Sequence, residues 1–169
     1  MGHREHHREA PRRVRVAVLT VSDTRTKDTD RSGVHIRRLL VKSGHAVEDY
    51  RVVRDDPVRI REVLKAWIKK PAIQAVILTG GTGISPRDGT VEVVEALLTK
   101  RLAGFGEIFR AISYRRIGAS AFLSRATAGL SGSKVLFSLP GSEDAVALAM
   151  ERLILPELGH LIQQVSKKS

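Results

Sequence analysis

The 169-residue sequence contains no cysteine, and only 4% of its residues are aromatic. Without cysteine the chain can form neither a disulfide nor a thiolate metal site, which fits a cytoplasmic protein. So few aromatic side chains provide no evident base-stacking platform for nucleic acid. No apolar run reaches the roughly 18 residues that span a bilayer, and the N-terminus lacks the apolar segment of a secretory signal. We therefore expect no membrane association.

Acidic residues are outnumbered: the chain has 18 Asp and Glu against 29 Lys and Arg, and its formal net charge is +11. Residues 1–13 are polar and show no periodicity, so they are predicted to form a disordered basic tail before a single domain at residues 14–165. The remaining basic residues are spread over several predicted helices. This spread favours small anionic substrates and no nucleic-acid partner, with a basic nucleic-acid-binding module kept as the minor alternative.

Hydrophobic periodicity predicts an α/β fold. Nearly continuous apolar runs are typical of buried parallel strands, and apolar positions spaced three and four apart predict helices between them. The resulting β-α-β-α-β order predicts a parallel sheet with right-handed crossovers. The predicted strands are 14–20, 46–53, 72–78 and 134–139; the predicted helices are 32–43, 57–69, 90–98, 107–117 and one from residue 143 with a break or kink at Pro156; Gly104–Gly106 is predicted to interrupt helical structure, and 120–129 fits no single pattern.

The stretch from Leu78 to Asp88 stands out because an apolar run ends at three glycines within four residues, Gly80, Gly81 and Gly83. A helical pattern begins almost immediately afterwards, at Thr90. Glycine backbone amides can approach an oxyanion closely, and the start of a helix adds a favourable potential, so this stretch predicts an anion-binding loop. It lacks the Gly-Lys-Ser/Thr of a Walker loop, and its Gly-Gly-x-Gly order differs from the dinucleotide-binding pattern.

Four polar stretches directly follow predicted strands and should meet at one sheet edge, where ligands bind in open parallel sheets. Carboxylates in three of them, beside an amide-rich turn, suggest Mg²⁺ and a phosphate ester. Structural alternatives stay open: Asp56 and Asp88 could cap helices, Asp23 could satisfy loop amides, and the glycines could serve only a turn. The stretches are Ser22-Asp23, Asp55-Asp56, the loop from Gly80 to Asp88, and Pro140-Gly141-Ser142.

Taken together, these stretches resemble the MoaB/MogA family of molybdenum cofactor biosynthesis proteins. The resemblance covers about residues 14–164, and the ending at 154–160 is more similar to MoaB than to MogA. The motifs that carry it are Thr79-Gly80-Gly81-Thr82-Gly83 with Pro86-Arg87-Asp88, Ser22-Asp23-Thr24-Arg25 with Asp30-Arg31-Ser32-Gly33, Asp55-Asp56, Gly104-Phe105-Gly106-Glu107, Ser120 with Ser124-Arg125-Ala126, and Leu139-Pro140-Gly141-Ser142.

The resemblance implies a three-layer α/β/α fold with a mostly parallel central sheet, of the molybdopterin-binding type and related to the G domain of gephyrin. Active members of the family adenylylate molybdopterin with Mg-ATP and release pyrophosphate. A non-catalytic molybdopterin-binding or carrier protein of the same pathway is the alternative. The resemblance also implies a homo-oligomer, either a trimer or a dimer of trimers, and contacts with other cofactor-biosynthesis proteins. The segment 105–130 is the candidate surface for association.

The family's functional positions can be carried over residue by residue. Asp55 and Asp88 match its two functional aspartates, which are implicated in catalysis and in holding Mg²⁺ or substrate. Ser113 is a further plausible contact. The expected contacts to molybdopterin and ATP are Ser22, Asp23, Thr79, Gly80, Gly81, Thr82, Gly83, Ser120, Arg125, Pro140, Gly141 and Ser142.

Overall fold

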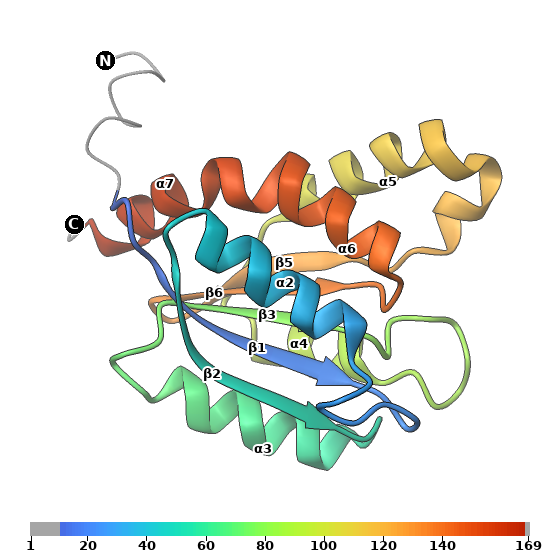
Figure 1. The fold of residues 1–169 in the computed structure, drawn as a ribbon, viewed down its shortest axis with the longest axis horizontal. Coiled ribbons are helices and arrows are strands. Elements are labelled where there is room, and N and C mark those ends of the chain that lie inside the picture. The colour runs from blue at the N-terminus through green and yellow to red at the C-terminus, as the bar shows by residue number, and fades with distance from the viewer. Residues whose placement is uncertain (1–10, 168–169) are drawn as a thin grey trace.

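The computed structural model describes residues 11–167 (Figure 1). Residues 1–10, which make up most of the predicted basic tail, lie outside the described part, as do residues 168–169. No helix of the described chain is both long enough and apolar enough to cross a membrane.

The centre of the fold is a single six-stranded sheet in the order β2-β1-β3-β6-β5-β4. The first four strands in this order are parallel, whereas β5 is antiparallel to β6 and β4 is antiparallel to β5. The predicted mostly parallel sheet is therefore confirmed. The strands are β1 (Arg15–Val21), β2 (Ala46–Val53), β3 (Ala75–Thr79), β4 (Lys100–Arg101), β5 (Thr127–Ser131) and β6 (Lys134–Leu139).

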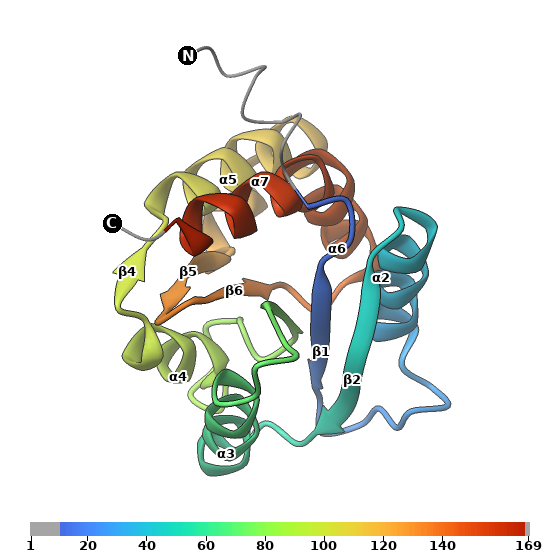
Figure 2. The same cartoon turned by 90° about the vertical axis from the view of Figure 1, so that its left-hand side faces the viewer.

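Helices cover both faces of the sheet, which makes the three layers that were expected (Figures 1 and 2). The helices α2 (Arg31–Lys42), α5 (Ala103–Ile117), α6 (Glu143–Ala149) and α7 (Leu155–Ser166) pack on one face. The helices α3 (Pro57–Ile68) and α4 (Thr90–Leu97) pack on the other. All five residues of β3 are buried, as a strand covered on both sides requires. The apolar stripe of each helix thus finds a matching apolar face of the sheet.

Local sequence signals account for the helix starts around the site. Asp56 caps α3 by accepting a hydrogen bond from the amide of Val58 at 2.9 Å, and Pro57 is the first helical residue. The capping interpretation of Asp56 is therefore confirmed. Ser142 caps α6 by accepting from the amide of Ala145. Trp67 is fully buried on the inner face of α3, where its indole N–H donates to Asp49 at 2.8 Å, so it packs in the core as expected.

The prediction that Gly104–Gly106 interrupts helical structure is wrong. These residues form the first turn of α5, which begins at Ala103. A Cβ on Gly106 would lie 2.6 Å from the carbonyl oxygen of Ala126, so close packing selects glycine there. The break expected at Pro156 takes the form of a π-helical turn, Met150–Ile154, between α6 and α7. Proline has no N–H for the helical hydrogen-bond ladder, and such turns are a usual accommodation.

Candidate functional site

The loops after the four parallel strands meet at one edge of the sheet, as the sequence predicts. Backbone pairing continues beyond the strands and ties the loops together: the amide of Ser22 donates to the carbonyl of Val53 at 2.8 Å, and that of Gly80 donates to Leu139 at 3.1 Å. Side chains add further ties. The Ser32 hydroxyl donates to the Gly141 carbonyl at 2.8 Å, and the Thr79 hydroxyl donates to the Pro140 carbonyl at 2.9 Å. The edge is therefore a connected unit.

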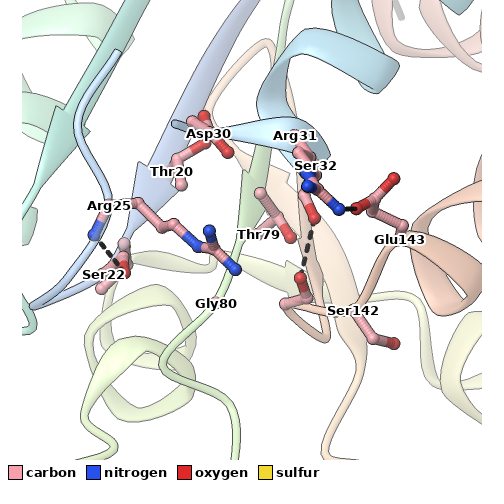
Figure 3. Close-up of a pocket in the computed structure, with 12 residues that line it drawn as sticks. Thr20, Ser22, Arg25, Asp30, Arg31, Ser32, Thr79, Gly80, Ser142 and Glu143 are labelled. Atoms are coloured by element: carbon pink, nitrogen blue, oxygen red, sulfur yellow. Dashed lines mark hydrogen bonds and ion pairs between the residues drawn. The ribbon is translucent and has the colours of Figure 1, made fainter. Parts of the chain in front are cut away.

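A cavity of about 280 Å³ lies between the start of α2 and the ends of β1 and β3 (Figure 3). Hydroxyl groups from several elements surround it, and Arg25 extends across it toward Thr79 and Gly80 (Figure 3). Hydroxyls, a guanidinium group and a helix start suit an anion such as phosphate. The lining residues are Thr20, Val21, Ser22, Arg25, Asp30, Arg31, Ser32, Thr79, Gly80, Gly141, Ser142 and Glu143.

A second cavity, of about 430 Å³, adjoins the first across Gly80, Gly141 and Ser142, which line both. Its walls combine the glycine loop and Asp88 with apolar side chains of α5 and the following 3₁₀ helix, Gly118–Leu123. An extended ligand could therefore place a polar end in the first cavity and a larger, less polar part in the second. The other predicted contacts that line this second cavity are Gly81, Thr82, Gly83, Ser120 and Pro140, together with Ser113.

The glycines of the loop are required by its geometry. Gly80 and Gly81 have φ values of +95° and +62°, which L side chains rarely adopt. A Cβ on Gly80 would also lie 2.1 Å from the carbonyl oxygen of Val21 at the end of β1. The loop thus runs directly against the neighbouring strand end and keeps its backbone close to both cavities.

Three carboxylates gather beside this loop. Asp23 accepts a hydrogen bond from the amide of Asp55 at 3.3 Å, and Asp55 accepts one from the amide of Gly89 at 3.4 Å. Asp88 accepts from the amide of Ser85 at 2.9 Å and does not cap α4, whose N-cap residue is Gly89 without a side-chain hydrogen bond. The carboxylates predicted from three separate segments are therefore brought together, and Asp23 also satisfies a loop amide.

Charges around Asp55 act in both directions. Burial raises the pKa of the Asp55 carboxyl, the hydrogen bond from Gly89 lowers it, and the carboxylates of Asp88 and Asp23 raise it. Arg87 lowers it and also pairs with Asp23, its guanidinium lying 2.9 Å from that carboxylate. The net effect is a pKa above the usual value for an aspartate.

Asp55 and Asp88 are the side chains at this edge that could hold a divalent cation. Among the described residues, no group of three or more His, Cys, Asp and Glu side chains is arranged to hold a metal ion. Mg²⁺ is commonly bound by one or two carboxylates together with substrate phosphates, and Asp55 and Asp88 can supply that pair.

Arg125 holds the glycine loop in place. Its guanidinium donates to the carbonyls of Thr82 at 3.2 Å and Asp88 at 3.0 Å, near both ends of the loop, and forms an ion pair with Glu92. It lines neither of the two cavities described above. Its expected contact with substrate stays a prediction, and the structure adds a role in fixing the loop.

The Arg125→Gln variant is expected to lower the free energy of unfolding by about 1–3 kcal/mol, because the two loop carbonyls lose a charged donor. Hydrogen exchange at residues 82–90 should accelerate as the loop loosens. Arg101→Gln is the control: Arg101 pairs with Glu95 at 2.7 Å, but its side chain is more than half exposed, so its loss should cost less than about 1 kcal/mol. Equal destabilisation and unchanged exchange would contradict the clamp role.

Asp30 was not among the predicted contacts, although it lies in one of the matched motifs. It is 2% exposed and accepts hydrogen bonds from the hydroxyls of Thr20 and Tyr50, both at 2.6 Å, and from the amide of Gly33 at 2.9 Å. It thereby caps α2 and fixes the helix start that faces the first cavity. The sequence signal for this role was an aspartate just before a predicted helix, a usual N-cap position. Arg25, which lines the first cavity, was also not among the predicted contacts.

Comparisons with known proteins identify the family of the chain. Residues 17–160 match the family described as "Probable molybdopterin binding domain". Molybdenum cofactor biosynthesis protein B of Bacillus cereus is 50% identical over 165 residues, which cover 97% of this chain and 98% of that protein.

Solved structures show the same fold. A crystal structure of a molybdenum cofactor biosynthesis protein B superimposes with a TM-score of 0.91 at 50% identity, covering 95% of this chain and 100% of that one. The tungsten cofactor synthesizing protein MoaB of Pyrococcus furiosus gives 0.83 at 37% identity, covering 94% and 100%. The resemblance found in the sequence is confirmed: the chain belongs to the MoaB/MogA family of probable molybdopterin-binding domains.

Proposed function

We propose that this protein acts in molybdenum cofactor biosynthesis by binding molybdopterin and transferring the adenylyl group of Mg-ATP to it, with release of pyrophosphate. The observation that carries the proposal is the meeting of two cavities at Gly80 and Gly141, the second of which Asp88 lines. Asp55 lies next to Gly81 in the wall of that second cavity and itself lines a neighbouring cavity with Asp23 and Arg87. Relatives named as cofactor biosynthesis proteins, at about half identity over nearly the whole chain, support the pathway.

Molybdopterin combines a ring system with a terminal phosphate, and the two cavities offer matching environments. The first supplies hydroxyls, the guanidinium of Arg25 and the start of α2 for the phosphate. The second supplies apolar walls that include Phe109 and Leu123, with the hydroxyls of Ser113 and Ser120 between them. The ring would lie against the glycine loop.

The proposed reaction joins two phosphate groups. An oxygen of the terminal phosphate of molybdopterin attacks the α-phosphorus of ATP, the bond from that phosphorus to the bridging oxygen breaks, and pyrophosphate leaves with the electron pair. Such a transfer needs alignment and charge neutralisation more than an unusual nucleophile. Loop amides would hold one anion, and Arg87 and Asp23 would fix the position of Asp55. Mg²⁺ held by Asp55 and Asp88 would neutralise charge on the α-phosphate.

A homo-oligomer, trimer or dimer of trimers, is part of the proposal. Large apolar side chains on α5 and the following 3₁₀ helix are exposed, among them Ile108, Tyr114, Ile117 and Phe122, the last at 74%. They lie in the segment 105–130, the candidate surface for association. Such a group of exposed apolar side chains is typical of an interaction surface.

Calorimetry with Mg-ATP alone separates an enzyme from a carrier. The adenylyltransferase is expected to bind Mg-ATP saturably without molybdopterin, and more weakly when EDTA removes Mg²⁺. A carrier has no need of a nucleotide. A protein that binds molybdopterin but gives no heat with Mg-ATP would therefore be the non-catalytic member of the pathway.

A further inference from the structure

The hydroxyl of Thr90 is buried beside Asp55 and has no hydrogen-bond partner. Thr90 is the first residue of α4 and is 0% exposed. Its Oγ1 makes no hydrogen bond within the described part of the chain. A Cβ placed on Gly81 would lie 2.2 Å from this oxygen and 2.7 Å from Oδ2 of Asp55. The hydroxyl and the carboxylate oxygen therefore approach the same point beside the glycine loop.

Backbone contacts fix both groups. The amide of Thr90 donates to the carbonyl of Gly81 at 3.1 Å, which ties the start of α4 to the loop. The neighbouring amide of Gly89 donates to Oδ1 of Asp55 at 3.4 Å. One oxygen of this carboxylate is thus held by the backbone, while the other lies on the side of the unpartnered hydroxyl.

An unpartnered buried hydroxyl does not stabilise the fold. Burying a hydroxyl without a hydrogen bond is unfavourable, and a valine of the same shape would avoid that cost. Buried polar groups are nearly always paired, so an exception calls for an explanation. The explanation here is a partner that is gained when the site is loaded.

We propose that Thr90 is a positioning residue whose hydroxyl donates to Oδ2 of Asp55 once that carboxylate engages Mg-ATP. The inference rests on the proposed function. The negative charges of Asp23 and Asp88 repel the Asp55 carboxylate, whereas the positive charge of Arg87 attracts it. A rotation toward the hydroxyl would hold it against both backbone and side-chain donors. Thr90 acts on the reaction through Asp55 and touches neither substrate.

Two substitutions test this inference. Thr90→Val is expected to melt at or above the temperature of the wild type, yet to bind Mg-ATP and turn it over about 10- to 100-fold less well, as the loss of a hydrogen bond to a charged group predicts. Molybdopterin affinity should stay unchanged. Thr90→Ser should restore nucleotide binding and turnover. Ser138→Ala is the matched control, because it removes another buried hydroxyl without a partner, in β6, and should leave binding and turnover intact.

The outcomes are separable from those of the proposed function. Thr90→Val with wild-type Mg-ATP affinity and turnover would overturn the inference. A melting temperature of Thr90→Val low enough to explain its loss of Mg-ATP affinity and turnover would also overturn it, because the hydroxyl would then have a structural role. If the wild type binds Mg-ATP but forms no product, the proposal of adenylyl transfer is wrong. Nucleotide binding by the two Thr90 variants then still decides the role of Thr90. If the wild type does not bind Mg-ATP, both the adenylyl-transfer proposal and the role of Thr90 are wrong.

Discussion

Replacing Asp88 by asparagine is expected to slow adenylyl transfer at least about 100-fold, while the affinity for molybdopterin changes far less. Asparagine keeps the size of the side chain and an oxygen that can accept from the amide of Ser85, as Asp88 does at 2.9 Å. The loop should therefore keep its shape, and the change isolates the negative charge beside Asp55. Steady-state kinetics and calorimetry with molybdopterin measure the two effects.

Asp28→Asn is the control for Asp88→Asn. Asp28 is an exposed aspartate in the loop between β1 and α2, and it lines neither cavity. Its neutralisation should leave both rate and affinity within about twofold of the wild type. Equal losses of turnover and molybdopterin affinity in Asp88→Asn would instead assign Asp88 to binding.

Gly81→Ala is expected to destabilise the protein by about 2–4 kcal/mol and to remove its activity. The added methyl would meet Oγ1 of Thr90 at 2.2 Å and Oδ2 of Asp55 at 2.7 Å, on a backbone whose φ of +62° already disfavours a side chain. The loop and Asp55 would have to move apart, which opens the site. Thermal unfolding and the transfer assay report the two losses.

Gly104→Ala is the control for Gly81→Ala. Gly104 lies in the first turn of α5, and a Cβ there would meet no atom within 4 Å. Alanine favours a helix over glycine, so this variant should be neutral or more stable by up to about 1 kcal/mol. If Gly81→Ala behaved in the same way, the loop would be far less constrained than its contacts indicate.

The sequence predicted the part of the fold that hydrophobic runs determine. The bounds of β2, Ala46–Val53, are those expected. The turn residue Gly44 precedes the strand and the polar pair Asp55-Asp56 follows it, so both ends are marked in the sequence. The two antiparallel strands, β4 at the edge and β5 beside it, were missed. In β5, Thr127-Ala128-Gly129 lacks the branched apolar residues that usually mark a strand. It is a strand because it pairs with β6 across the two-residue turn Gly132-Ser133. That Gly-Ser turn was the local signal for a hairpin.

The residues of the site also differ in how far the sequence predicts them. Carboxylates that directly follow strands, such as Asp23 and Asp55, could be placed because parallel strands end at one edge. The hydroxyl of Thr90 could not, since its burial and missing partner exist only after α4 packs against the loop. Arg125 was predicted from a motif, but its donation to two loop carbonyls depends on the folded path of the backbone.

The most direct test of the account follows the α-phosphate of ATP. Protein, Mg²⁺, molybdopterin and ATP labelled at the α-phosphate are incubated together, and the label and pyrophosphate are quantified. The label is expected to appear in adenylylated molybdopterin with one pyrophosphate for each label transferred, and Asp88→Asn is expected to suppress both. No transfer of label at high protein concentration, by protein shown to bind molybdopterin, would contradict it.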